Sequence, residues 1–156
     1  MRRLLLVANP SASGFTGALF REASAILSEA YEVTAAWPDG PDDARHSAEE
    51  AARSGFDVVV AMGGDGVVHH VGNGLVHTDT ALGILPVGTT NVVARILGLP
   101  RNPKKAARAL ATAIPERIPV AHIATENPNG ARSRYALFSL GVGFDADVVT
   151  IAEQRP

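Results

Sequence analysis

The sequence predicts an α/β fold, a three-layer domain in which helices cover both faces of a largely parallel sheet. Short apolar runs rich in β-branched residues alternate along the chain with stretches whose apolar residues recur at helical spacing. Two of these runs, Leu4–Ala8 and Val58–Met62, are apolar throughout, as expected for strands covered on both sides. A strand-helix alternation of this kind implies parallel strands joined by right-handed crossovers.

Four strands are predicted in the first part of the chain: Arg3–Ala8, Glu32–Trp37, Asp57–Met62 and Leu82–Val87. The second strand alternates apolar and polar residues, which indicates a position nearer an edge of the sheet. Apolar stripes and helix-ending residues predict five helices over Leu19–Ala30, Ala44–Ser54, Val67–Val76, Val92–Leu97 and Arg101–Ile114. Asp42 and Asp43 are expected to cap the second of these helices.

The pattern changes after Pro115, where the sequence predicts the start of a second, β-rich domain. Two strands, Ile118–Ala124 and Tyr135–Leu140, are joined by the turn sequence Asn127-Pro128-Asn129-Gly130. We therefore expect an α/β domain over residues 1–117 and an incomplete β-rich domain over residues 118–156. Two strands cannot bury their own apolar side chains, so this hairpin is expected to move or to contact a partner, with a homodimer as one outcome.

Composition and charge exclude several classes of protein. The chain has 156 residues, 46% of them hydrophobic, and a net charge of −2, which argues against a disordered chain and against a broad basic nucleic-acid surface. It has no cysteine for a disulfide or a thiolate site, so a reducing cytoplasm is the expected compartment. No apolar run approaches the ~20 residues that span a bilayer, so any membrane contact is expected to be peripheral.

Charge is divided between two segments. Residues Glu22–Asp57 carry nine acidic and two basic side chains, whereas Arg101–Arg117 carries five basic and one acidic. Both segments are interpreted first as solvated helix faces. The basic segment is also suited to rest on an anionic membrane surface.

The sequence Gly63-Gly64-Asp65-Gly66 follows the third strand directly and is the strongest chemical motif. Its glycines would leave backbone N–H groups open at the carboxyl edge of a parallel sheet, where ligands bind in such folds, and so form a cradle for an anion. Asp65 would then hold Mg²⁺ or accept a proton from a hydroxyl. The alternative is a tight turn that needs positive φ at glycine, with Asp65 as a helix cap.

Two further polar loops follow other predicted strands. Leu85-Pro86-Val87-Gly88-Thr89-Thr90-Asn91 comes at the end of the fourth strand, and Asn9-Pro10-Ser11-Ala12-Ser13-Gly14 follows the first. Because the carboxyl ends of parallel strands share one edge, we expect the three loops to converge on one crevice. None is a Walker A loop, since no G-x-x-x-x-G-K-[ST] occurs. The adjacent His69 and His70 would point about 100° apart on a helix and are expected to be structural or surface side chains, with His70 or His77 as the histidine expected to border the crevice.

In order and spacing, these motifs resemble those of the diacylglycerol kinase catalytic domain family, which is shared by bacterial lipid kinases and sphingosine kinases and is more distantly related to NAD kinases. The resemblance rests on Asn9-Pro10-Ser11 with Gly14, on Gly63–Gly66 with Asn73-Gly74-Leu75, and on Leu85–Asn91 with Ala94-Arg95. The form Pro86-Val87-Gly88-Thr89-Thr90-Asn91 is closer to the bacterial diacylglycerol kinases than to sphingosine kinases. Gly141–Ala146, within Phe138–Val148, resembles the family's entry into its second domain.

The resemblance implies an ATP-dependent lipid kinase that phosphorylates diacylglycerol or a related lipid hydroxyl at a membrane surface. ATP and Mg²⁺ are the implied cofactors, and Asp65 is the implied catalytic and metal-binding residue. The implied nucleotide contacts are Asn9, Gly63, Gly64, Gly66, Gly88, Thr89, Thr90 and Asn91. No nucleic-acid partner is expected.

The sequence departs from the family pattern at several positions. Val67 stands where the family usually has Thr, and Val92 where it often has Asp. His69 and His70 stand where Asn and Glu are common. The family's second domain is almost absent, so these 156 residues alone are expected to bind Mg-ATP without transferring phosphate. Two alternatives stay open: an NAD kinase, which has a similar glycine loop, and a non-catalytic nucleotide-binding module.

Overall fold

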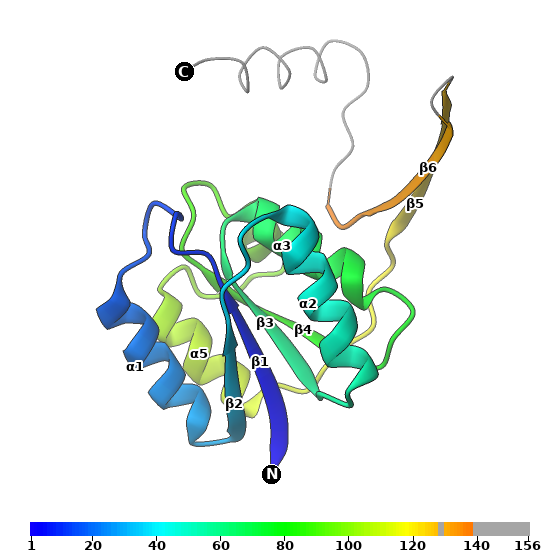
Figure 1. Ribbon diagram of the computed structural model, residues 1–156. Helices are drawn as coiled ribbons and strands as arrows, with labels where there is room; N and C mark the ends of the chain where they lie inside the picture. Colours follow the sequence, from blue (N-terminus) through cyan, green and yellow to red (C-terminus); the bar gives the residue numbers. More distant parts are fainter. Residues whose placement is uncertain (128–129, 139–156) are drawn as a thin grey trace. The chain divides into compact units, whose positions relative to one another are not determined.

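The structure, a computed structural model, describes residues 1–127 and 130–138 (Figure 1). The chain divides into two compact units, Met1–Pro119 and a second one that starts at Val120. Pro128 and Asn129 of the predicted turn lie outside the described residues, as do Leu140 and the motif Gly141–Ala146. None of the described helices is long and apolar enough to cross a membrane.

The first unit is built on a four-stranded parallel sheet with the strand order β2-β1-β3-β4. Each boundary lies within one residue of its prediction: β1 (Arg2–Ala8), β2 (Tyr31–Ala36), β3 (Val58–Gly63) and β4 (Ala81–Pro86). β2 lies at an edge of the sheet, as its alternating pattern predicted. The chain leaves β1 toward one edge and β3 toward the other, so the carboxyl ends of β1 and β3 form the switch point at which parallel sheets bind ligands.

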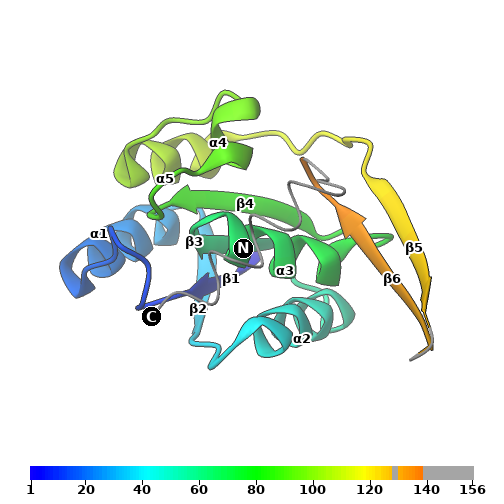
Figure 2. The ribbon, with the colours of Figure 1, turned by 90° about the horizontal axis from the view of Figure 1, so that it is seen from above.

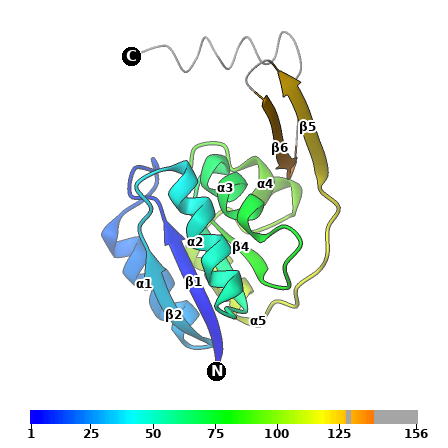
Figure 3. The same cartoon turned by 45° about the vertical axis from the view of Figure 1, so that its right-hand side comes forward.

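Helices cover both faces of this sheet. On one face lie α1 (Gly17–Ser28) and α5 (Pro103–Thr112), and on the other lie α2 (Pro41–Arg53) and α3 (Asp65–Leu75) (Figures 1 and 2). The predicted three-layer α/β fold is therefore confirmed. The short helix α4 (Val92–Ile96) follows β4 and lies near α3 (Figure 3).

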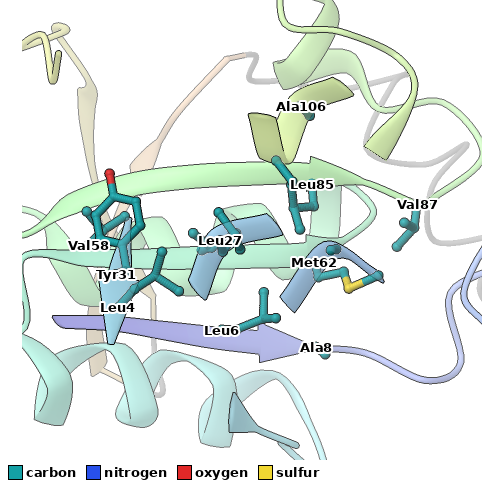
Figure 4. Packing of buried hydrophobic residues seen from close by; sticks show 13 residues of the cluster. Leu4, Leu6, Ala8, Leu27, Tyr31, Val58, Met62, Leu85, Val87 and Ala106 are labelled. Atoms are coloured by element: carbon teal, nitrogen blue, oxygen red, sulfur yellow. The ribbon is translucent and has the colours of Figure 1, made fainter. Parts of the chain in front are cut away.

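The core on the α1 and α5 face is built from alternate residues of the central strands (Figure 4). Leu6 of β1, Met62 of β3 and Leu27 of α1 are fully buried there. Tyr31 is also buried, and its hydroxyl donates a hydrogen bond to the Leu110 carbonyl at 3.1 Å. The phenol can therefore be buried without leaving its polar atom unsatisfied.

The opposite face is closed by small residues. Ala44, Ala48 and Ala51 form the buried side of α2, and Gly74 of α3 packs against it. A Cβ on Gly74 would lie 2.5 Å from the carbonyl oxygen of Arg45. The two helices are thus closer together than any residue larger than glycine would allow at this point.

Helix α2 begins at Pro41, three residues earlier than predicted, so the predicted capping role of Asp42 and Asp43 is wrong. Gly40 is the N-cap, and Pro41 suits the first helical position because its φ is preset and it lacks an N–H group that would need an acceptor. Both aspartates lie in the first turn, where negative charge favours the helix. Asp43 also accepts a hydrogen bond from the Asp39 backbone at 3.0 Å.

The described part of the second unit is an antiparallel hairpin of β5 (Ala121–Asn127) and β6 (Gly130–Ala136). The predicted hairpin is confirmed, but its strands lie closer to the turn than Ile118–Ala124 and Tyr135–Leu140. Asn127 pairs with Gly130, so the short turn sets the pairing from its own ends outward. Polar residues such as Arg134 therefore join the ladder although they break the apolar pattern that the prediction followed.

Candidate functional site

Three loops meet at the carboxyl end of the parallel sheet, as the strand-end pattern predicted. The Asn9 N–H group donates to the Met62 carbonyl at 3.0 Å, which ties the loop after β1 to β3. Gly14 donates to the Val87 carbonyl at 2.8 Å, and Val87 donates to the Gly63 carbonyl at 3.1 Å. The loops that follow β1, β3 and β4 are therefore joined directly by backbone hydrogen bonds.

The turn between β3 and α3 consists of little more than Gly64. β3 ends at Gly63 and α3 starts at Asp65, so Gly64 is the N-cap, with an extended backbone. No glycine of this turn has a positive φ, so the alternative of a turn that needs glycine for its backbone angles is wrong. Space requires glycine instead: a Cβ on Gly88 would lie 2.5 Å from the Gly64 Cα atom.

The first turn of α3 offers backbone donors to a ligand. The N–H groups at the start of a helix have no intrahelical acceptor, and they carry the positive end of the helix dipole. In α3 the first backbone hydrogen bond of the helix is donated by the Val68 N–H group to the Gly64 carbonyl. A Cβ on Gly66 would meet nothing within 4 Å, so the approach to this turn is open.

Asp65 links the glycine turn to α4. Its Oδ1 atom accepts a hydrogen bond from the Val93 N–H group at 3.0 Å, in the first turn of α4. Asp65 therefore does act as a helix cap, but of α4 rather than of its own helix. No other described residue makes a hydrogen bond or an ion pair with this carboxylate, which leaves Oδ2 for a ligand.

Asn91 shapes the loop between β4 and α4. Its Oδ1 accepts from the Gly88 N–H group at 3.0 Å, and its Nδ2 donates to the Gly88 carbonyl at 2.6 Å. The residue has a left-handed backbone, with φ of 51°, which asparagine tolerates better than most residues. Thr89 and Thr90 are exposed beside it, and the Thr89 hydroxyl lies 3.2 Å from that of Ser13.

Five of the nine predicted site residues line hollows at this edge, and they are divided between two hollows rather than gathered in one crevice. The first, which we call the Asn9 hollow, has a volume of about 340 Å³ and is lined by Asn9, Ser11, Pro38, Asp39, Gly40, Pro41, Ala44, Gly66, Val67 and His70. The second, the Thr89 hollow, has a volume of about 400 Å³ and is lined by Pro86, Thr89, Thr90, Asn91, Ala94, Arg95, Leu99 and Arg101. Gly63, Gly64, Asp65 and Gly88 line neither of these two hollows.

The Asn9 hollow is lined by hydrogen-bond donors in one part and by a carboxylate acceptor in another. Gly66 brings the open first turn of α3 to it, and Asn9 adds an amide whose Oδ1 accepts from the Ser11 N–H group at 2.9 Å. No described residue bonds to the Asn9 Nδ2 atom, so this donor is available. After β2, Asp39 contributes a carboxylate. The hollow can therefore accept a ligand with an anionic group and a hydroxyl group.

Asp39 and Arg101 carry charge and line the hollows but were not predicted as site residues. Asp39 belongs to a fourth loop, which follows β2, and its position after a strand is the same signal that identifies the other three loops. Arg101 lines the Thr89 hollow but was counted only as part of a charged helix face. His70 lines the Asn9 hollow, whereas the neighbouring His69, whose ring centre lies 5.2 Å away, does not.

The sequence model of the family described as "Diacylglycerol kinase catalytic domain" matches residues 3–123. The match takes in β1 to β4, all three bonded loops and both hollows. The chain belongs to the diacylglycerol kinase catalytic domain family. The predicted family is thus confirmed on the segment that carries the motifs.

Individual relatives agree with this assignment. The chain is 39% identical over 105 residues to the diacylglycerol kinase of Bacillus subtilis (strain 168), a match that covers 65% of this chain and 35% of that protein. It is 44% identical over 105 residues to the diacylglycerol kinase of Mycobacterium tuberculosis (strain ATCC 25618 / H37Rv), covering 67% and 33%. The crystal structure of a diacylglycerol kinase from Bacillus anthracis str. Sterne superposes with a TM-score of 0.65 at 30% identity, covering 70% and 42%.

The matched part of the chain spans about a third of the length of these curated relatives. Residues 3–123, which the family model matches, include all the candidate site residues described above.

Asp65 fits the part of a single carboxylate ligand to Mg²⁺. In phosphate-transferring sites this ion is held by one or two carboxylates together with substrate phosphates and water. Among the described residues, no group of three His, Cys, Asp or Glu side chains is arranged to hold a metal by itself. An ion at this site would therefore depend on the nucleotide for most of its oxygen ligands.

Proposed function

We propose that this chain binds Mg-ATP and forms the nucleotide-binding part of a lipid kinase that transfers the γ-phosphoryl group to the hydroxyl of diacylglycerol or a related lipid. The observation that carries the proposal is the bonded edge of three loops, in which the open first turn of α3 lies beside a carboxylate with a free oxygen. A helix start of this kind binds phosphate. The family membership and the names of the relatives support the lipid kinase reaction.

The charge of the Asn9 hollow favours one orientation of the nucleotide. Asp39 would repel phosphate, whereas the α3 turn and the Asn9 amide would attract it. We therefore place the phosphates at the Gly66 end and the ribose at the Asp39 end. In doubly wound α/β folds, an acidic residue after the second strand commonly accepts a hydrogen bond from a ribose hydroxyl.

Phosphoryl transfer asks the protein mainly for positioning and for stabilisation of charge. The backbone N–H groups at the start of α3 would orient the phosphates, and Asn91 keeps the neighbouring loop in place through Gly88. Asp65 would orient the metal or the acceptor hydroxyl through Oδ2 while Oδ1 holds α4. Mg²⁺, when bound, would neutralise part of the phosphate charge.

Calorimetry and a transfer assay test the proposal. The chain should bind ATP in the presence of Mg²⁺. We expect it to transfer no phosphate to diacylglycerol in detergent micelles, because the match covers about a third of the relatives' length and we place the part that closes over the acceptor in their remainder. A chimera that continues from this chain into the remainder of the B. subtilis relative should phosphorylate diacylglycerol. Absence of ATP binding, or phosphorylation of NAD in place of the lipid by the chimera, would overturn the assignment.

The orientation of the nucleotide has a separate test within the same titrations. Asp39→Asn should weaken ATP binding about fivefold, since a hydrogen bond to a charged acceptor is worth at least about 1 kcal/mol. The same substitution should leave the affinity for 2′,3′-dideoxy-ATP unchanged, because that ligand lacks both hydroxyl donors. An equal effect on both nucleotides would contradict the orientation and leave ATP binding itself intact.

A further inference from the structure

Helix α4 and the turn after it present apolar side chains to solvent. Ile96 is 64% exposed and the adjacent Leu97 is 43% exposed, although single exposed apolar residues elsewhere on the chain, such as Ile114, have no such neighbour. Scattered apolar residues are normal on a protein surface, whereas adjacent ones bordered by polar groups mark an interaction site.

Two arginines border these apolar residues. Arg95 and Arg101 are exposed, and both line the Thr89 hollow. Both also line a third hollow, of about 570 Å³, whose lining includes Ile96 and Leu99. Neither guanidinium forms an ion pair or a hydrogen bond with a described residue. Their charge is therefore not neutralised within the part of the chain that the structure describes.

The wider segment is also basic. Residues 86–114 contain five basic residues and no acidic one. Lys104 of α5 forms an ion pair with Glu22 of α1, whereas Lys105 and Arg108 of the same helix, like Arg95 and Arg101, form none with a described residue. Of these four unpaired basic side chains, Arg95 and Arg101 are the two that line a hollow together with the exposed Ile96.

We propose that Arg95, Ile96, Leu97 and Arg101, which we call the α4 surface, dock on an anionic phospholipid membrane. Apolar side chains that enter the boundary between headgroups and acyl chains, with arginines paired to lipid phosphates around them, are the combination that interfacial protein segments use. The pattern of charge selects this occupant, because a purely apolar partner would leave two guanidiniums desolvated without a counter-charge.

Docking through the α4 surface would bring lipid close to the candidate site. Arg95 and Arg101 line the Thr89 hollow together with Thr89 and Thr90, which belong to the loop bonded to the glycine turn. The proposed function explains why docking would be useful, since docking would deliver a lipid hydroxyl, and only this part of the inference rests on it. Vesicle binding needs neither ATP nor turnover, so it can succeed or fail independently of kinase activity.

Co-sedimentation of the full chain with vesicles tests the proposal. Vesicles of phosphatidylcholine with 30% phosphatidylglycerol, on the order of a typical anionic leaflet, should bind the chain, and pure phosphatidylcholine vesicles should bind it far less. Arg95→Gln with Arg101→Gln should weaken binding by roughly 25-fold, at about fivefold for each arginine. Ile96→Ser with Leu97→Ser should weaken binding at least about tenfold through the lost apolar burial.

Matched variants elsewhere on the surface control for charge and apolarity. Arg21→Gln with Arg53→Gln removes two exposed arginines from α1 and α2, and Ile114→Ser removes another exposed apolar residue; both should bind vesicles like the wild type. Equal losses in the control and test variants would overturn the proposal, as would no binding by the wild type. It would also be overturned if light scattering showed a dimer that Ile96→Ser with Leu97→Ser dissociates while vesicle binding is unchanged.

Discussion

The carboxylate of Asp65 has one oxygen bonded to the protein and one open to a ligand. Asp65→Asn keeps an oxygen that can accept from Val93 but removes the negative charge. We expect the free energy of unfolding to change by less than about 1 kcal/mol, because the cap on α4 is retained. The Mg²⁺-dependent part of ATP binding should be lost. Urea unfolding, together with calorimetry in the presence and absence of Mg²⁺, measures both effects.

Asp65→Ala is the matched control, since it removes the cap as well as the charge. It should lower the free energy of unfolding by about 1 kcal/mol, the usual value of a helix cap, and should lose Mg²⁺-dependent binding to the same extent as Asp65→Asn. If Asp65→Asn bound Mg-ATP like the wild type, the carboxylate would be a cap alone.

At this scale the sequence indicated which residues belong to the edge but not what each side chain does there. Asn9 and Asn91 both lie in the expected loops, yet both polar atoms of the Asn91 amide bond to Gly88, while the Asn9 Nδ2 has no partner among the described residues. Such a difference depends on the backbone angles of each loop and on its neighbours in space. Residue type and spacing cannot distinguish the two asparagines.

Substitutions at two glycines of α3 should distinguish the residues that this helix needs for stability from those that it needs for nucleotide binding. A Cβ on Gly74 would lie 2.5 Å from the Arg45 carbonyl and 2.9 Å from the Ala48 Cβ atom, whereas a Cβ on Gly66 meets nothing within 4 Å. Gly74→Ala should therefore destabilise the chain by about 1–3 kcal/mol through overpacking. Gly66→Ala should be neutral or stabilising by up to ~1 kcal/mol, because alanine is the better helix former.

Nucleotide binding should show the opposite order. The added methyl group of Gly66→Ala lies at the open start of α3, where it obstructs the approach of phosphate, so ATP affinity should fall. Folded Gly74→Ala should bind ATP like the wild type. Thermal unfolding and calorimetry on the two variants check this, and full ATP affinity in Gly66→Ala would place the phosphates elsewhere.

Strands with a continuous apolar pattern were predicted to within one residue, whereas helix and strand ends that depend on capping or turn residues were not. β1 and β3 are buried on both faces, so hydrophobicity alone locates them. α2 begins at Pro41 because proline suits the first helical position, a signal that the aspartates after it obscured. The pairing of β5 and β6 follows the turn at Asn127 and Gly130, which the search for apolar runs could not show.

On the scale of the whole molecule, the order of the strands explains why distant segments share one site. β1 and β3 lie side by side at the centre of the sheet, and the chain leaves them in opposite directions. The loops that follow these two strands therefore start next to each other at the same edge of the sheet. Loops from β2 and β4 complete the edge from either side and supply Asp39 and Thr89. Four segments separated by tens of residues therefore come together through sheet topology alone.

The same topology predicts that residues 1–119 are sufficient for folding and for nucleotide binding. The four parallel strands, the five helices found among the described residues and both hollows lie within this unit, and the ion pair between Arg117 and Asp79 is kept. A chain that ends at Pro119 should unfold cooperatively, with a midpoint within about 4 °C of the full chain, since a change in stability of about 1 kcal/mol moves the midpoint of a domain this size by about 4 °C.

ATP affinity of the shortened chain should lie within about twofold of the full chain, because every proposed phosphate and ribose contact is retained. Circular dichroism melts and calorimetry on the two chains make the comparison. A shortened chain that is unfolded would mean that residues after Pro119 contribute to the core of the α/β unit. A folded one that has lost ATP would mean that part of the nucleotide site lies beyond the four strand-end loops.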